Sequence, residues 1–244
     1  MSVTGQYLDF QVRQRVIRPV IAFREYIFRD LLPQFGMLDE RAEQIADECY
    51  NRMTSEPASD DFDGDISVFA EEANDQALSW YEMMRSLRQT MLNLLAAGLF
   101  HLVEQQLASL CRDAAFRVGP PRDTKLEVVT EWYASTLRLD LRHLPAWPMI
   151  DELRLVANAA KHAEGPSSGK LRTLRPELFC NPVLAAASDG TGIKDYFLNR
   201  AISAPLAGED LFVSESLLTS YAEGAETFFR QIAEYFDTHA DEYY

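Results

Sequence analysis

The chain has 244 residues, 47% of them hydrophobic, so it is long enough to bury a real core as one large domain or two smaller ones. Its formal net charge of −15 argues against a protein that coats nucleic acid through a broad basic surface. The first residues lack a basic start followed by an apolar core, which argues against a secretory signal and predicts a cytoplasmic protein. Cys49, Cys111 and Cys180 are far apart and odd in number, so neither a disulfide framework nor a paired-cysteine metal site is expected.

The N-terminal part predicts a helical region over residues 1–55. Between Leu8 and Leu32 apolar residues recur at helical spacing, and the sequence that follows, with Pro33 and Gly36, ends this helix. A second helix is expected from Asp39 to Met53.

Residues 56–65 are acidic and contain Pro57 and Gly64, so they are expected to form a linker. The surrounding segment has a superficial likeness to a calcium loop. Ser59 and Ala70 stand where such a loop needs its first and last acidic ligands, and no metal site is therefore predicted.

Residues 66–244 are expected to form the main helical domain. A long helix from about Ile66 to Arg117 is rich in Leu, Met and Ala, which predicts burial on much of its circumference. Its longest apolar stretch, Met91 to Val103, is interrupted by Asn93 and is too short to cross a bilayer, so no membrane contact is expected.

Three further helices complete an all-α helical bundle with long central helices. They are expected over Thr124–Leu144, over Met149–Glu164, where Pro148 suits the first turn and Gly165 and Pro166 end the helix, and from Ser214 to about His239. One short extended segment is expected near 210–213.

The helix Met149–Glu164 gathers polar side chains on one stripe. At 100° per residue, an arc of about 100° holds Asp151, Arg154, Asn158, Lys161 and His162, with apolar residues on the other side. An arginine can hold a phosphate oxygen and an imidazole can exchange a proton near neutral pH. Together they suit attack of a ribose 2′-hydroxyl on its own phosphodiester, a reaction that needs no metal.

On this helix stands the segment ELRLVANAAKHAEG, which resembles the signature helix of the HEPN superfamily. The upstream segment LFHLVEQQLASLCRD looks like the long helix that precedes the signature. The resemblance implies a cofactor-free, metal-independent endoribonuclease of a toxin or antiviral-defence system, which cuts RNA as a homodimer and has an antitoxin or defence-system partner. In that function His162 would transfer the proton, Arg154 would contact the phosphate, Asn158 would be an accessory polar residue and Lys161 would contact RNA.

The chain departs from the family pattern in its spacing, because seven residues separate Arg154 from His162, more than is usual. A structural interpretation therefore stays open. Lys161 and His162 occupy the last turn, where cations interact favourably with the helix dipole, and Asp151 and Arg154 are spaced for an ion pair. The alternative function is a catalytically inactive helical interaction or regulatory protein, including one whose acidic segments occupy a basic partner.

Overall fold

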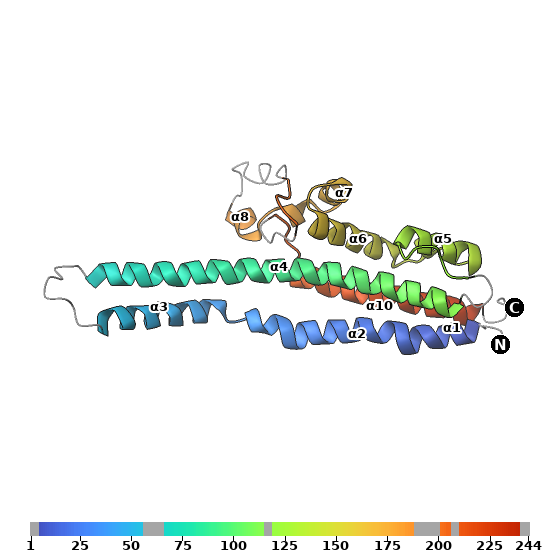
Figure 1. Ribbon diagram of the computed structural model, residues 1–244, viewed down its shortest axis with the longest axis horizontal. Helices are drawn as coiled ribbons and strands as arrows, with labels where there is room; N and C mark the ends of the chain where they lie inside the picture. Colours follow the sequence, from blue (N-terminus) through green and yellow to red (C-terminus); the bar gives the residue numbers. More distant parts are fainter. Residues whose placement is uncertain (1–4, 56–65, 115–118, 188–200, 206–209, 240–244) are drawn as a thin grey trace.

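The computed structural model describes residues 5–55, 66–114, 119–187, 201–205 and 210–239. All regular secondary structure in these ranges is helical, which confirms the all-α prediction. The helices form an elongated rod in which both ends of the described chain lie at the same end (Figure 1). The acidic segment 56–65, expected to be a linker, lies outside the described residues.

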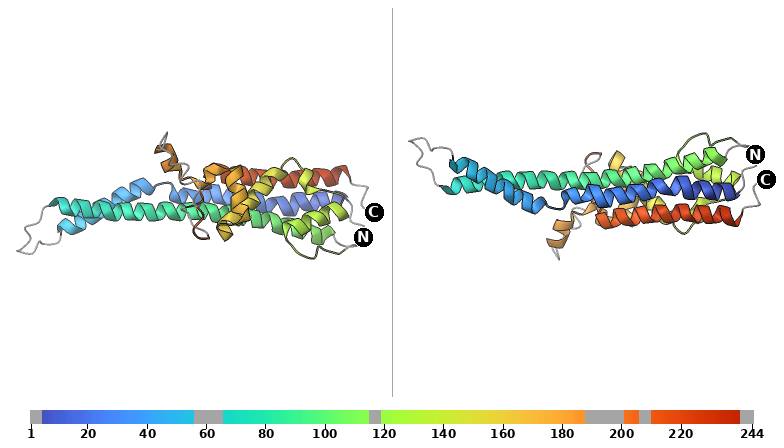
Figure 2. Two further views of the ribbon diagram at one scale, coloured as in Figure 1. Left: turned by 90° about the horizontal axis from the view of Figure 1, so that it is seen from above. Right: turned by 90° about the horizontal axis from the view of Figure 1, so that it is seen from below.

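Helix α4, Ile66–Ala114, is the axis of the rod (Figures 1 and 2). Its 49 residues correspond to a length of about 73 Å at 1.5 Å per residue. Its buried residues are concentrated in the second half, from Leu92 to Cys111, whereas the first half buries only Ala73 and Ala77. The core of the protein therefore lies around the second half of α4.

The N-terminal helices pack against this core as one nearly continuous run. The run buries Leu8, Val12, Val16 and Val20 in the same hydrophobic cluster as α4. Its segments are α1 Gly5–Gln11, a π turn Val12–Val16, α2 Ile17–Tyr26, a second π turn Ile27–Leu31 and a 3₁₀ turn Leu32–Phe35. The two π turns flank α2, which contains Pro19, a residue that removes one helical hydrogen bond.

Helix α3, Leu38–Ser55, continues away from the core beside the first half of α4 and forms a two-helix arm with it (Figures 1 and 2). The thiol of Cys49, the buried residue of α3, lies 3.1 Å from Oε1 of Gln76 on α4. Because the arm buries few side chains, it extends the rod and adds little to the core.

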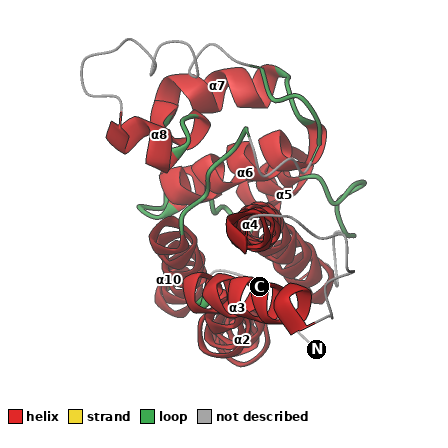
Figure 3. Cartoon of the chain, turned by 90° about the vertical axis from the view of Figure 1, so that its left-hand side faces the viewer, coloured by secondary structure: helices red, strands yellow, loops and turns green. Residues whose placement is uncertain are grey.

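Helix α10, Glu215–Thr238, runs beside α4 and α1 and supplies the largest part of the aromatic core. The helix was predicted to start at Ser214, and the hydroxyl of this residue caps it by accepting a hydrogen bond of 3.1 Å from the Leu217 N–H. The other side of α4 is covered by shorter helices (Figure 3). These are α5 Leu126–Thr136, a 3₁₀ turn Leu141–His143, α6 Trp147–His162, α7 Pro166–Leu174, a 3₁₀ turn Pro176–Phe179 and α8 Pro182–Ala187.

The structure corrects the helix expected over Thr124–Leu144. Helix α5 ends at Thr136 because the N–H groups of Leu137 and Leu139 both donate to the Tyr133 carbonyl, at 2.9 and 3.2 Å. Arg138, between them, has φ of 54°, in the left-handed region that a helix cannot use.

By length and composition α4 could cross a membrane, yet half of its most apolar window is buried inside the fold. The core helix of a soluble protein has the same properties. The helix alone therefore carries no argument about location.

Candidate functional site

Helix α6 lies between the core and α7, and its sides are buried as its sequence predicts. Ile150, Leu153, Val156, Ala157 and Ala160 are all buried against the core. Leu155 and Ala159, on the other flank of the polar stripe, are buried as well, and α7 packs against α6. The exposed face of α6 is consequently narrow.

Arg154 is engaged in an ion pair on this face. Its Nε and Nη2 atoms donate to the same Asp151 carboxylate oxygen, at 2.9 and 2.7 Å. The spacing of the two residues predicted this pair, which partly neutralises the guanidinium. Asp151 keeps 44% of its side-chain surface exposed, so the pair remains accessible to solvent.

The other three residues of the stripe are on the same face but are not enclosed. The Nδ2 atom of Asn158 lies 3.4 Å from the Oγ atom of Ser167, at the start of α7. Lys161 is half-buried, and His162 is exposed at the last position of α6. The main cavities of the described chain are lined by other residues. Eight helical steps also separate Arg154 from His162 by about 12 Å along the axis.

The residues that follow His162 build a tight corner between α6 and α7. Ala163 adopts φ of 59°, and Pro166 begins α7. Ser168 accepts a hydrogen bond of 2.7 Å from the Gly165 N–H and closes the first turn of α7. The segment that resembles the family signature therefore ends in a well-defined structural motif.

Glu164 fastens this corner to more distant parts of the chain. Its carboxylate accepts two hydrogen bonds from Arg172, at 3.1 and 2.9 Å, and one of 3.1 Å from the Ile202 N–H. The Arg172 guanidinium also lies over the Phe179 ring, 4.4 Å from its centre. These contacts, the Arg172 hydrogen bonds above all, lower the pKa of Glu164 from 4.5 to about 2.

The spacing difference from the family has a structural counterpart. In the family that the segment resembles, four to six residues separate the arginine from the histidine, so an arginine with that spacing to His162 would stand at Leu155, Val156 or Ala157. All three positions are buried and apolar in this chain. The packing of α6 therefore leaves no room for a guanidinium there, and Arg154 lies one to three residues before these positions.

A second polar cluster lies on the other side of α6 and was not predicted. Glu152 accepts hydrogen bonds from Nη1 of Arg175, at 2.5 Å, and from the Tyr221 hydroxyl, at 2.7 Å. Burial raises the pKa of Tyr221 well above its usual range. One signal was present in the sequence. Glu152 is a charged residue about 160° around the helix from Arg154, on the side that is otherwise apolar and buried.

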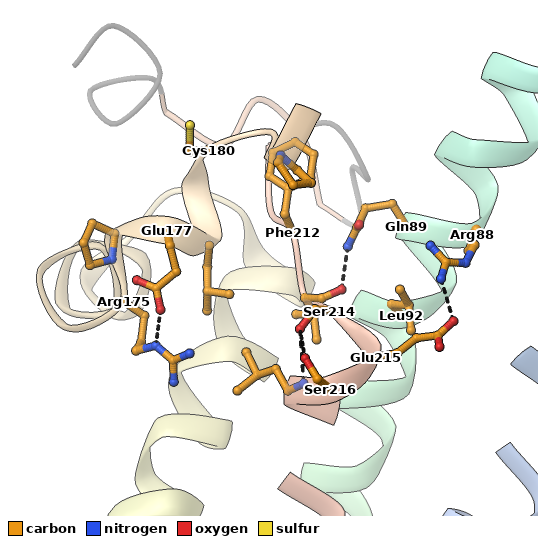
Figure 4. Close-up of a pocket in the computed structure, with 15 residues that line it drawn as sticks. Arg88, Gln89, Leu92, Arg175, Glu177, Cys180, Phe212, Ser214, Glu215 and Ser216 are labelled. Carbon is orange, nitrogen blue, oxygen red and sulfur yellow. Dashed lines mark hydrogen bonds and ion pairs between the residues drawn. The ribbon is translucent and has the colours of Figure 1, made fainter. Parts of the chain in front are cut away.

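This cluster adjoins a cavity of about 800 Å³ (Figure 4). Its walls come from α4, from the segment after α7 and from the start of α10. Arg88 and Glu215 form an ion pair of 2.5 Å at one side, and Arg175 and Glu177 form another of 2.5 Å at the opposite side. The apolar lining consists of Leu92, Pro176, Leu178, Pro182, Phe212, Val213 and Leu217.

The extended segment expected near 210–213 forms one wall of the cavity, but it is not a strand. Side chains of α4 hold it instead of a neighbouring strand. Asn93 donates to the Leu211 carbonyl at 2.8 Å, and Gln89 donates to the Val213 carbonyl at 3.0 Å.

Comparison with known proteins gave no relative. The chain matches no protein-family model, no curated protein and no solved structure.

Proposed function

We propose that this protein is a catalytically inactive, HEPN-like helical interaction protein that does not cleave RNA. We propose further that it pairs with a second copy of itself through α4. The supporting observation is an apolar stripe on the outer face of α4. Met83, Leu87 and Leu94 share this face, and each leaves between 43% and 59% of its surface exposed. Their separations of four and seven residues are those of a helix–helix seam.

The order of residues along the stripe is self-complementary. A twofold axis between Thr90 and Met91 would run two α4 helices antiparallel and would place each Leu87 against Leu94 of the other copy. The same register places Met83 opposite Gly98, where the missing side chain leaves space for the methionine. A surface that matches itself in this way is what a twofold dimer requires.

The charges at the two ends of α4 favour the same arrangement. In the antiparallel register, Arg112 near the C-terminal end would lie within one turn of Glu72 of the other copy. Both residues are exposed. The helix dipoles of an antiparallel pair also place opposite ends together.

The pairing is tested by light scattering on Leu87→Glu/Leu94→Glu. We expect the wild type to have the mass of a dimer and the double variant that of a monomer, because the twofold axis would bury four new carboxylates. The dimer dissociation constant should rise by roughly a hundredfold or more, with unchanged helicity.

The matched control is Leu78→Glu. Leu78 is 55% exposed on the same helix but lies about 140° from the stripe, so this variant should remain dimeric. A monomeric wild type, or equal dissociation by the control, would show that the stripe is not the interface.

A second candidate function is metal-independent endoribonuclease, with the toxin or defence role, the RNA substrate, the partner protein and the cytoplasmic location that the resemblance implies. The observation in its favour is that Arg154, Asn158, Lys161 and His162 share one accessible face. The exposed Asp151 carboxylate could yield its place on Arg154 to a phosphate.

The two functions are distinguished by incubating RNA with the wild type, Arg154→Ala and His162→Ala in excess EDTA. A ribonuclease would leave 2′,3′-cyclic phosphate ends, and each variant would lose activity by about 10² to 10⁴-fold. His143→Ala is the control, since this histidine is 86% exposed outside the stripe. The binding proposal expects no cleavage by any of the four proteins, and cleavage that depends on both residues would replace it. Growth arrest on expression, relieved by His162→Ala, would assign a toxin.

A further inference from the structure

We infer that the cavity between α4, the segment after α7 and the start of α10 binds a small amphipathic molecule with an apolar body and an anionic head group. The inference is independent of the pairing through α4. A volume of about 800 Å³ is within the range of small-molecule sites.

The apolar lining of the cavity is already formed in the structure and can receive the apolar body of a ligand. Leu92, Leu178 and Val213 are buried residues that reach the cavity from three separate segments of the chain. Phe212 is half-buried and lies across the upper side of the cavity in Figure 4. A ligand that covered this lining would remove apolar surface from water, which is the main driving force for such binding.

One wall of the cavity is held rigidly by polar contacts. Arg175 bonds to Glu152, whose side chain is only 14% exposed and is also held by the Tyr221 hydroxyl. This charge pair is partly buried and has several hydrogen bonds, so its disruption would be costly. Arg175 therefore has a structural role, and we do not assign it to the head group.

The ion pair on the opposite wall is different. The side chains of Arg88 and Glu215 are 36% and 42% exposed, and such exposed pairs contribute little to stability. The Glu215 carboxylate can move into solvent at small cost and leave Arg88 to a ligand. A guanidinium binds planar carboxylates and phosphates in a two-pronged geometry.

Neighbouring hydroxyl groups add to this preference for an anion. Ser214 and Ser216 both line the cavity, and their Oγ atoms lie 3.0 Å apart beside Glu215. The head group recognised by Arg88 and these hydroxyls is a carboxylate or a phosphate monoester, because both present several acceptor oxygens to such donors.

The test uses the full chain and three probes of equal chain length: decanoate, decyl phosphate and decanol, each below its micelle-forming concentration. Titration calorimetry should give saturable binding of at least one anion, about tenfold tighter than decanol. The stronger of the two anions identifies the head group. No saturable binding, or equal affinity for decanol and both anions, would overturn the inference.

Two variants of the ion pair should change affinity in opposite directions. Arg88→Gln should reduce the affinity for the anion about tenfold, to the level of decanol. Glu215→Gln removes the competing carboxylate and should increase the same affinity several-fold. Arg142→Gln, on the 3₁₀ turn after α5, is the control for charge alone and should change nothing. If both ion-pair variants shifted the affinity in the same direction, or neither did, Arg88 would not bind the head group.

A separate variant tests the part of the cavity that would hold the apolar body of the ligand. Phe212→Ala should weaken all three probes by the same factor, since it removes apolar contact and leaves the ion pair intact. A loss confined to the anions would contradict the assignment of this wall to the apolar body.

Discussion

Phe228→Ala is expected to lower the free energy of unfolding by about 3–5 kcal/mol. Phe228 is fully buried on α10, with its ring centre 5.5 Å from that of Phe229 and 6.2 Å from that of Trp147 on α6. Helix α10 also contacts α1, α2 and α4. Truncation would leave a cavity that none of these rigid neighbours could fill.

Urea unfolding followed by circular dichroism measures the loss. Because a domain of this kind is stable by about 5–15 kcal/mol, the variant should unfold at a much lower urea concentration. Phe10→Ala is the control: Phe10 is 57% exposed on α1, and its truncation should cost about 0.5 kcal/mol or less. Comparable losses in both variants would mean that Phe228 contributes no more to the core than an exposed side chain does.

The sequence predicted α10 well because its signals are strong and local. Apolar residues recur along it at helical spacing, and all of these are buried: Leu217, Leu218, Tyr221, Phe228, Ile232 and Phe236. Ser214 was expected to start the helix, and its side chain caps it. A long amphipathic pattern that follows a capping residue leaves few alternative structures.

The residues after α5 show where such reasoning fails. Leu137, Arg138 and Leu139 have ordinary helical propensity, so the sequence predicted a helix through them. In the structure two N–H groups share the Tyr133 carbonyl, and the Tyr133 ring is itself buried with its hydroxyl 3.2 Å from the Leu107 carbonyl on α4. Tertiary contacts decide the end of this helix, and local propensity does not contain them.

For the candidate site, the sequence predicted only which residues share one face of α6. Helical geometry gave the stripe of α6 and the ion pair between Asp151 and Arg154. It could not give the contact of Asn158 with Ser167, which depends on how the chain turns after His162. The cluster of Glu152, Arg175 and Tyr221 was still harder to predict, because its members come from α6, from the junction after α7 and from α10.

Burial along the long helix α4 was also predictable only in part. Its richness in Leu, Met and Ala predicted burial on much of its circumference, and its second half is buried in this way. Met83, Leu87 and Leu94 remain exposed because α3, α6 and α10 pack on other faces. Apolar composition alone does not distinguish a side chain that packs in the core from one available to a partner.

Asn93→Leu is expected to lower the free energy of unfolding by about 2–4 kcal/mol, although leucine has nearly the same volume. Asn93 is buried in the second half of α4. Its amide donates to the Leu211 carbonyl at 2.8 Å, and its Oδ1 accepts from the Val213 N–H at 3.3 Å. Leucine can replace neither bond, so two buried backbone groups would lose their side-chain partner.

The same change should disturb the cavity as well as the fold, because residues 211–213 form one of its walls and lead into α10. Amide hydrogen exchange of Val213 should become faster, and the affinity for an anionic decyl probe should fall.

Gln89→Leu is the matched control, since Gln89 lies one turn earlier and holds the same segment through a single bond of 3.0 Å to the Val213 carbonyl. It should cost about 1 kcal/mol. If Asn93→Leu left the exchange of Val213 unchanged, the segment would be positioned by its apolar side chains, and the hydrogen bonds from α4 would have no controlling role in the shape of the cavity.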